Sequence, residues 1–346
     1  MAYGTINADL MTTSDGVSSS GLYGFKNRII NGAMVIDQRN AGASVSVSTS
    51  GVYVLDRWKN RANGGGVFTV QQSSTVPSGF NTSSVYTVTT ADSSIAAGDN
   101  YWIVQDIEGY NVADLGWGTA NAQTVTISFW VRSSVTGTFN VGVTNGTTYD
   151  RSYVSTYTVN VANTYEYKTI TIAGDTTGTW GKTNDGGISL TFNLGAGTNY
   201  QATANTWTAG FKQSTSGSTN LIATNGATFY ITGVQLEKGS TATSFDYRPY
   251  SAELAMCQRY FLPMQCVNWC GYRPTASTGA LQVPFVYPIL RAAPTFTQLS
   301  GTVNGSNVTF DVGQAQSNYL RLYHNITYAA GTVAEASLSF TLSAEL

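Results

Sequence analysis

Apolar and polar residues alternate with a period of two along much of this chain. The clearest run is residues 124–132, where every second position is apolar: Val125, Ile127, Phe129 and Val131. The alternation returns after turn signals at Thr136-Gly137 and at residues 185–187, in Phe139, Val141 and Val143 and in Ile188, Leu190, Phe192 and Leu194. Successive side chains of a strand point to opposite faces, so these runs predict strands with one buried face.

Two other segments depart from simple alternation. In residues 229–236, Phe229 and Ile231 share one face, and the apolar face resumes one position late at Val234 and Leu236. An extra residue would restore the phase, which predicts a β-bulge at Gly233. Residues 27–39 (NRIINGAMVIDQR) are strand-like, with a turn signal at Asn31-Gly32.

A helical pattern is predicted at residues 251–261. Leu254, Cys257 and Phe261 fall on one helical face, and Ser251 is a suitable N-cap. Pro249 precedes this segment and Pro263 is expected to end it. We place a domain boundary at this helical connector, residues 249–263.

The succession of short strands without helical patterns predicts an all-β fold, namely an antiparallel jelly-roll or β-sandwich over residues 26–248. A parallel β-helix would show a fixed repeat, and none is found. Residues 264–346 alternate again and predict a second, small β-sandwich domain, with Pro274, Pro284, Pro288 and Pro294 at edges and turns. Residues 1–25 are rich in Gly, Ser and Thr and are interpreted as an N-terminal attachment arm.

Composition supports a folded β protein and excludes several function classes. Charged residues make up only 10% of the chain, against a usual value of about 25%, but aromatic residues reach 12%, which argues against disorder. The net charge is −2 and the 17 basic residues are scattered, so nucleic acid is not an expected partner. No apolar run approaches the length of about 20 residues that crosses a bilayer, and residues 1–5 do not resemble a signal peptide.

The cysteine and histidine residues do not predict a disulfide framework, a zinc site or a catalytic triad. Cys257, Cys266 and Cys270 cannot all pair within one chain, and we expect thiols in a protein that folds in a reducing cytoplasm. A structural zinc ion would need four such ligands, yet His324 is the single histidine. A serine–histidine–aspartate triad would also depend on His324, which lies in no recognisable motif. No catalytic residue is predicted, and the protein is expected not to be an enzyme.

Four carboxylates are candidates for glycoside hydrolysis or for calcium binding. Asp106 and Glu108 are spaced to share one strand face, as a glycosidase pair or as an ordinary solvated pair. The same pair, or Asp175 and Asp185 in Gly-rich loops, could instead bind a structural calcium ion, which takes carboxylate and carbonyl oxygens as ligands. No other cofactor is expected.

Glycan-binding modules use flat aromatic rings beside a few hydrogen-bonding side chains. The candidates for such platforms are Trp117, Trp207, Trp269 and Tyr272. Trp58 and Trp130 lie in sequence segments that predict a structural role and are weaker candidates for a platform. For each of these rings the alternative is an anchor in a core or an oligomer interface.

Three groups of segments resemble a recurrent pattern in tail-fibre and other structural proteins of bacteriophages and prophages. They are residues 27–40 (NRIINGAMVIDQRN) with 54–58 (VLDRW); residues 125–132 (VTISFWVR) with 165–168 (YEYK) and 174–180 (GDTTGTW); and residues 231–239 (ITGVQLEKG) with 245–250 (FDYRPY) and 253–260 (ELAMCQRY). Their order and spacing extend over about two-thirds of the chain.

The resemblance implies a jelly-roll domain similar to carbohydrate-binding modules, a helical connector and a variable distal domain. It also implies a homotrimeric tail fibre, made in the cytoplasm of a host bacterium, that joins other virion proteins through the N-terminal arm and attaches to the host surface, with a surface glycan as the expected receptor. A capsid decoration or head fibre and a glycan-degrading tailspike remain alternatives. A cellular carbohydrate-binding module would usually be exported, which the N-terminal sequence disfavours.

Overall fold

The computed structural model describes residues 26–273, 277–303, 306–328 and 332–346. The chain divides into two compact units, Met1–Pro249 and Tyr250–Leu346, and each is described by itself. The predicted N-terminal arm, residues 1–25, lies outside the described residues. The described part of the chain has no helix with the length and hydrophobicity needed to span a membrane.

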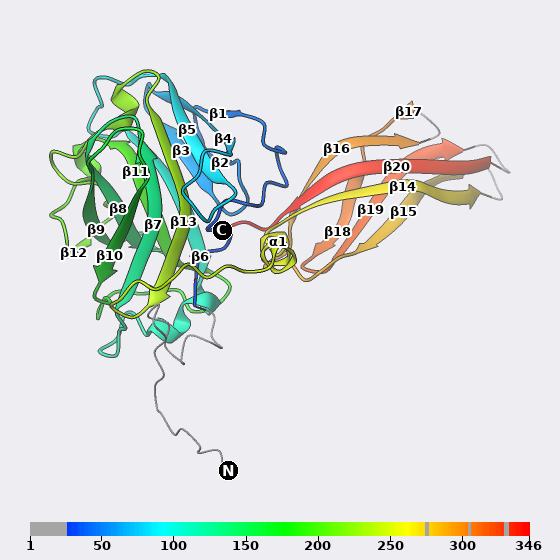
Figure 1. The fold of residues 1–346 in the computed structure, drawn as a ribbon. Coiled ribbons are helices and arrows are strands. Elements are labelled where there is room, and N and C mark those ends of the chain that lie inside the picture. Colours follow the sequence, from blue (N-terminus) through cyan, green and yellow to red (C-terminus); the bar gives the residue numbers. More distant parts are fainter. Residues whose placement is uncertain (1–25, 274–276, 304–305, 329–331) are drawn as a thin grey trace, which may run out of the picture. The chain divides into compact units, whose positions relative to one another are not determined.

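The first unit contains two antiparallel sheets (Figure 1). One has six strands, in the order β1 (Val45–Val47), β4 (Val67–Ser73), β5 (Ser83–Thr90), β13 (Thr228–Lys238), β7 (Val125–Ser133) and β10 (Glu166–Ile172). The other has seven, in the order β12 (Trp207–Ala209), β9 (Arg151–Val159), β8 (Gly137–Asn145), β11 (Gly186–Ala196), β6 (Asn100–Glu108), β3 (Lys59–Asn63) and β2 (Ser50–Tyr53). Short 3-10 helices lie between strands: η2 (Gly109–Asn111), η3 (Ala113–Leu115), η4 (Thr198–Tyr200) and η5 (Leu221–Ala223).

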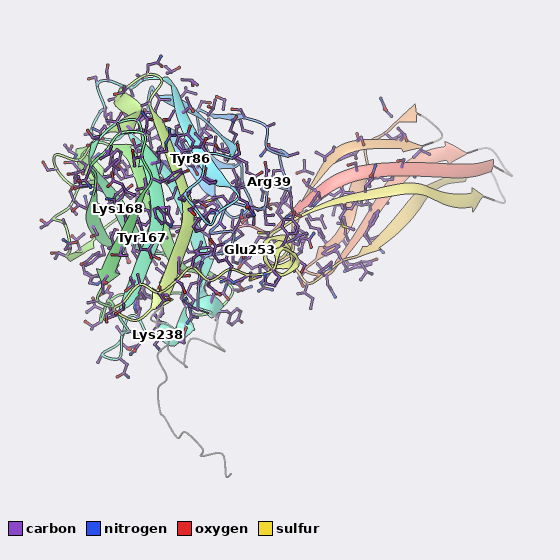
Figure 2. The ribbon with its side chains drawn as sticks, viewed as in Figure 1. Arg39, Tyr86, Tyr167, Lys168, Lys238 and Glu253 are labelled. Atoms are coloured by element: carbon purple, nitrogen blue, oxygen red, sulfur yellow. The ribbon has the colours of Figure 1, made fainter. Side chains whose placement is uncertain are left out.

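The predicted alternation is confirmed in β7, β8 and β11. Their apolar residues form part of one buried core together with residues from the other sheet strands, among them Phe129, Val141, Phe192 and Phe229. Tyr86 on β5, labelled in Figure 2, is also in this core and is 1% exposed. The all-β antiparallel sandwich predicted for this part of the chain is therefore confirmed.

The predicted β-bulge at Gly233 is present. The pairing of β13 with β7 shifts register between Thr232 and Gln235, and Gly233 has a φ of +62°. An added Cβ there would lie 2.6 Å from the Phe80 ring, so glycine meets both the backbone and the packing requirement. The bulge restores the phase, because Val234 and Leu236 are fully buried.

The strand predicted for residues 27–39 is wrong. The segment is buried but irregular, because Asn31 and Met34 both have a φ of +58°, which lies outside the extended region of regular strands. Side chains replace the missing sheet partners. The Asn31 Nδ2 donates to the carbonyl oxygens of Ile36 (2.8 Å) and Asp56 (3.0 Å), and its Oδ1 accepts from the Ile36 N–H. The turn predicted at Asn31-Gly32 is present.

Two segments of the recurrent pattern meet here, although they are about 200 residues apart in sequence. Asn27 donates to the Val234 carbonyl (3.1 Å) and accepts from the Leu236 N–H (3.1 Å). Arg248 donates to the carbonyl oxygens of Ile29 and Asn27. We call residues 27–36, 234–236 and 246–248 the clasp. Within the described residues, this part of the recurrent pattern has a structural role, because its side chains join segments of the first unit by hydrogen bonds.

The second unit is also a two-sheet antiparallel structure, preceded by one helix. The helix is α1 (Tyr250–Gln258). The four-stranded sheet has the order β14 (Phe261–Arg273), β20 (Thr332–Ser343), β16 (Thr295–Val303) and β17 (Ser306–Asn307), and the three-stranded sheet has the order β15 (Ser277–Val286), β19 (Tyr319–Tyr328) and β18 (Asp311–Gln316). Its core includes Leu320, Leu322, Leu338 and Phe340. The second β-sandwich is therefore confirmed.

The predicted helix boundaries are wrong in detail. α1 begins at Tyr250 and ends at Gln258, so Ser251 is a helical residue and not the N-cap. Pro263 does not end the helix but lies in β14, opposite Thr341. Both β14 and β15, which holds Pro284, are edge strands, where a residue without an N–H is tolerated.

Candidate functional site

A groove lies on the outer face of the seven-stranded sheet, where side chains of β3, β6 and β11 point away from the core. Residues 210–215, which we call the covering segment, fold over the other half of this face. The Lys212 N–H donates to the Ser152 hydroxyl on β9, and Ser214 donates to the Asn140 side chain on β8. The covering segment thus forms one wall, and the exposed half of the sheet forms the floor.

The groove encloses about 470 Å³ and is lined by residues from four strands and two loops. Its floor and walls are Ser50 and Gly51 on β2; Lys59 and Arg61 on β3; Trp102, Val104 and Asp106 on β6; Ser189 and Thr191 on β11; and Tyr149, Phe211 and Gln213 from loops. The strand register places Arg61 opposite Trp102, and Ser189 opposite Asp106. This volume is within the range of small-ligand sites.

Two aromatic rings of the groove, Trp102 and Tyr149, each pack edge-to-face against a third, Phe211. The Trp102 and Phe211 rings are 6.3 Å apart between centroids, and those of Tyr149 and Phe211 are 5.6 Å apart. Burial raises the pKa of Tyr149, and the negative charge of Asp106 raises it further. The Tyr149 hydroxyl therefore stays protonated at neutral pH and can donate a hydrogen bond.

Asp106 is 3% exposed, and its carboxylate already has partners. It forms an ion pair with the Lys59 ammonium and accepts from the Ser189 hydroxyl. Asp106 and Glu108 do share a strand face, as their spacing predicts, and Glu108 is 1% exposed. A glycosidase acid needs a carboxyl that can exchange a proton with a leaving group, whereas the Asp106 charge is held by a lysine.

Several polar atoms around the groove are buried and have no hydrogen-bond partner among the described residues. They are the Trp102 indole nitrogen, the Thr191 hydroxyl, the Arg61 Nε and both amide atoms of Gln213. Gln213 is fully buried. Buried polar groups are nearly always paired, so a cluster of unpaired ones indicates a place where a ligand or ordered water supplies the partners.

Trp117, predicted as a glycan platform, is a core residue. It is 3% exposed, and its indole N–H donates to the Gln123 carbonyl. Its ring packs edge-to-face against Trp180 and Trp207, at centroid distances of 4.7 and 5.4 Å. The platform prediction is wrong for Trp117 because no face of the ring is open. Trp207 is partly exposed, but its N–H donates to the Ala173 carbonyl, and its role as a platform stays a prediction.

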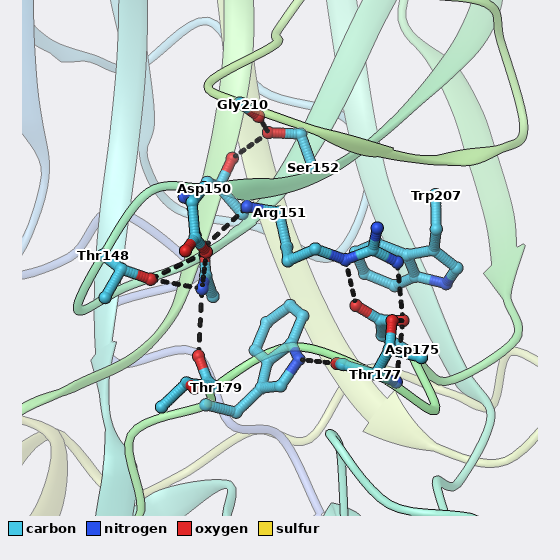
Figure 3. Close-up of polar contacts among 12 residues, drawn as sticks. Thr148, Asp150, Arg151, Ser152, Asp175, Thr177, Thr179, Trp207 and Gly210 are labelled. Atoms are coloured by element: carbon cyan, nitrogen blue, oxygen red, sulfur yellow. Dashed lines mark hydrogen bonds and ion pairs between the residues drawn. The ribbon is translucent and has the colours of Figure 1, made fainter.

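Asp175 does not have the surroundings of a calcium ligand. The Arg151 guanidinium holds its two carboxylate oxygens at 2.8 Å each, and Thr177 donates to it as well (Figure 3). Asp185 accepts from the Thr183 backbone and hydroxyl. No group of three or more acidic, histidine or cysteine side chains gathers in the described part of the chain. An arginine on the carboxylate would repel a cation, so the calcium prediction is wrong for Asp175.

The remaining predicted residues lie in the second unit. Trp269 and Tyr272 belong to β14, where they pair with Ala336 and Val333, and His324 pairs with Leu281. Their side chains, like those of Cys266 and Cys270, lie outside the described residues. Cys257 is buried in α1. The platform prediction for Trp269 and Tyr272 stays untested.

A second aromatic groove of about 430 Å³ lies on the outer face of the six-stranded sheet. Trp130 and Tyr167 lie in it with centroids 5.3 Å apart, and Tyr167, labelled in Figure 2, is 44% exposed. Trp130 is therefore a surface residue, although its sequence suggested framework. None of the described residues lining this groove has a buried polar side-chain atom without a partner. Trp58, in contrast, is 1% exposed and belongs to the core.

Comparisons with known proteins give distant structural likenesses. No family model matches the sequence, and no curated protein matches it. The structure is similar to the enzymatically active domain of tailspike protein 4 from bacteriophage CBA120, at 14% identity over 62% of this chain and 21% of that chain, with a TM-score of 0.33. The chain thus spans about a fifth of that tailspike structure.

Two further likenesses cover nearly the whole of the other chain. One is a putative sugar binding protein from Bacteroides thetaiotaomicron VPI-5482, at 10% identity over 62% of this chain and 100% of that chain, with a TM-score of 0.36. The other is a family 11 carbohydrate-binding module from Clostridium thermocellum, at 13% identity over 58% of this chain and 98% of that chain, with a TM-score of 0.30. At these values the function has to be argued from the groove itself.

Proposed function

We propose that this protein is a non-enzymatic glycan-binding protein and that the groove on the seven-stranded sheet is its glycan site. The observation that carries the proposal is the combination of aromatic rings with buried, unpartnered polar atoms in one groove. A sugar presents apolar C–H faces and polar hydroxyls, so it fits rings beside donors and acceptors. Asp106 is held by Lys59 and Ser189, which disfavours the tailspike hydrolase alternative.

Each part of the groove has a role in this proposal. The rings of Trp102, Phe211 and Tyr149 provide apolar contact. Thr191 and Gln213, which are 0% exposed in the unliganded groove, provide hydrogen bonds for hydroxyls after a small shift of the covering segment opens them to the sugar. A sugar that pairs these atoms would remove the free-energy cost of leaving them buried and unpaired, which is about 1 to 3 kcal/mol for each group.

We further propose that the protein is a subunit of a tail fibre of a bacteriophage virion, with attachment to host-surface glycan as its work. The support is the resemblance of its sequence pattern to phage structural proteins and the glycan-like chemistry of the groove. A homotrimer would place three grooves on one fibre, and several fibres on one particle would turn a weak site into strong attachment. A capsid decoration remains the alternative location.

Replacing Trp102 by alanine is expected to weaken glycan binding at least about tenfold, because the largest ring of the groove is lost. Gln213→Leu keeps the side-chain size but removes the amide, and we expect a similar loss. Binding is measured on a panel of immobilised bacterial surface polysaccharides, with bound sugars confirmed by titration calorimetry. Tyr110→Ala removes a ring that is 62% exposed and outside the groove, and it is the control.

Tryptophan fluorescence establishes that each variant is folded before its binding is compared. If Trp102→Ala and Gln213→Leu, both folded, bind every sugar as the unaltered protein does, the groove is not the glycan site. Absence of binding to the whole polysaccharide panel by the unaltered protein would count against glycan recognition itself.

Deleting residues 1–25 is expected to leave a folded protein that no longer joins the particle, because this segment is proposed to dock on other virion proteins. Assembly is measured by electron microscopy of particles that carry the truncated chain. Cryo-electron microscopy of complete particles also distinguishes the two locations, since density on the tail supports the fibre and density on the capsid supports the decoration. A truncated protein that fails to fold would overturn the arm assignment.

A further inference from the structure

The positive and negative charges of the side chains that line the groove do not cancel. Three charged side chains line it, namely Lys59, Arg61 and Asp106. Lys59 and Asp106 form an ion pair with each other. One positive charge, that of Arg61, is therefore left over in the groove, although the chain as a whole carries a net charge of −2.

Arg61 is held in place by packing and not by an acidic partner. It lies on β3 between Ser50 on β2 and Trp102 on β6, and its guanidinium carbon is 5.7 Å from the centroid of the Trp102 ring. Its Nε is buried without a hydrogen-bond partner, and the side chain has no ion pair with any described residue. The guanidinium thus packs on the Trp102 ring while its Nε donor remains unused.

We propose that the groove binds an anionic sugar and that Arg61 pairs with its carboxylate. This inference rests on the proposed glycan-binding function and names the class of sugar. A guanidinium presents donors in a planar fork that matches the two oxygens of a carboxylate. The sugar ring lies against Trp102 while its acid group faces Arg61, and the hydroxyls reach Thr191 and Gln213.

Three arginines of this unit lie over aromatic rings, namely Arg39 over Tyr53, Arg61 over Trp102 and Arg132 over Tyr230, and of these only Arg61 lines the groove. Arg132 on β7 also lies over an aromatic ring, with its guanidinium carbon 4.6 Å from the Tyr230 centroid. Its Nε, however, donates to the Asn163 carbonyl at 2.9 Å. Arg132 is therefore held by a hydrogen bond as well as by its ring, whereas the Arg61 Nε is unpaired at the floor of a groove.

The test compares anionic sugars with their neutral counterparts by ligand-observed NMR and calorimetry on the full chain. The pairs are α-1,4-trigalacturonate with α-1,4-galactotriose, 3′-sialyllactose with lactose, and glucose 6-phosphate with glucose. We expect trigalacturonate or 3′-sialyllactose to bind tenfold or more tightly than its neutral counterpart, and more weakly as salt is added, whereas a preference confined to glucose 6-phosphate would overturn the carboxylate assignment. The third pair distinguishes phosphate from carboxylate as the recognised group.

Arg61→Met keeps the side-chain stem on Trp102 and removes the charge, so it should abolish the preference while any neutral binding persists. Arg61→Lys keeps the positive charge but lacks the planar pair of donors, so this variant should retain only part of the preference for anionic sugars. Arg132→Met is the matched control and should leave the preference unchanged. Equal affinity for both members of every pair, or an unchanged preference in folded Arg61→Met, would overturn the inference and leave the glycan proposal standing. Failure to bind any of the six sugars also overturns it, and the polysaccharide panel then decides the broader proposal.

Discussion

Replacing Asn31 by alanine is expected to lower the free energy of unfolding of the first unit by about 3 to 4 kcal/mol, because it leaves buried backbone groups unpaired. The Asn31 side chain pairs both the N–H and the carbonyl of Ile36 and also the carbonyl of Asp56. Its φ of +58° adds to the loss, since asparagine tolerates this conformation better than alanine.

The measurement is urea unfolding followed by tryptophan fluorescence. Six of the seven tryptophans lie in the first unit, so the signal reports mainly on that unit. Asn81→Ala removes an exposed asparagine and should change the free energy by less than about 0.5 kcal/mol. A loss below 1 kcal/mol for Asn31→Ala would show that the clasp does not depend on this side chain.

The strands were predictable where the two faces of a strand differ. In β8 and β11 one face enters the core and the other carries Gly, Ser, Thr and Asn, so the period of two is visible in the sequence. Even the bulge could be located, because a glycine at the phase slip is the residue that a left-handed backbone position favours.

The clasp was not predictable, because its apolar residues are buried without a regular backbone. Residues 27–39 have the hydrophobicity of a strand, yet their hydrogen bonds come from side chains such as Asn31 and from β13, which is about 200 residues away. Pro263 likewise looked like a helix stop because a proline ends helices, but its edge position in β14 tolerates the missing N–H.

The groove was missed for a related reason. Trp102 belongs to β6, whose nine residues are all buried, so its sequence shows no outward face to single out. Phe211 and Gln213 reach Trp102 only because the covering segment folds across β8 and β9. The sequence signal for the groove is the run around Trp102 and Asp106, in which an aromatic residue and an acidic residue share the outward face of one strand. The predicted ring Trp117 instead packs among other tryptophans.

Asp175→Asn is the second substitution for which we expect a large effect, a loss of about 2 to 3 kcal/mol at neutral pH, because hydrogen bonds to a charged group are lost. Asp175 is 2% exposed and binds Arg151 through both oxygens, which ties the start of β9 to the loop after β10 (Figure 3). Asp114→Asn is the control, since this carboxylate also pairs with an arginine but is 48% exposed, and its loss should stay below about 1 kcal/mol.

The effect of Asp175→Asn should depend on pH with a definite sign. Burial raises the pKa of Asp175, but the hydrogen bonds from Arg151 and Thr177 outweigh it and hold the pKa below the usual value of 3.8. The unfolded chain therefore takes up this proton first, and the stability that the carboxylate contributes is present above about pH 4 and lost as pH falls through the folded pKa. Unfolding free energies of the unaltered protein and the variant, measured by urea from pH 7 to pH 2.5, should converge at the acid end because a protonated aspartate resembles asparagine. A difference that stays constant over this range would mean that the charge of Asp175 does not stabilise the fold.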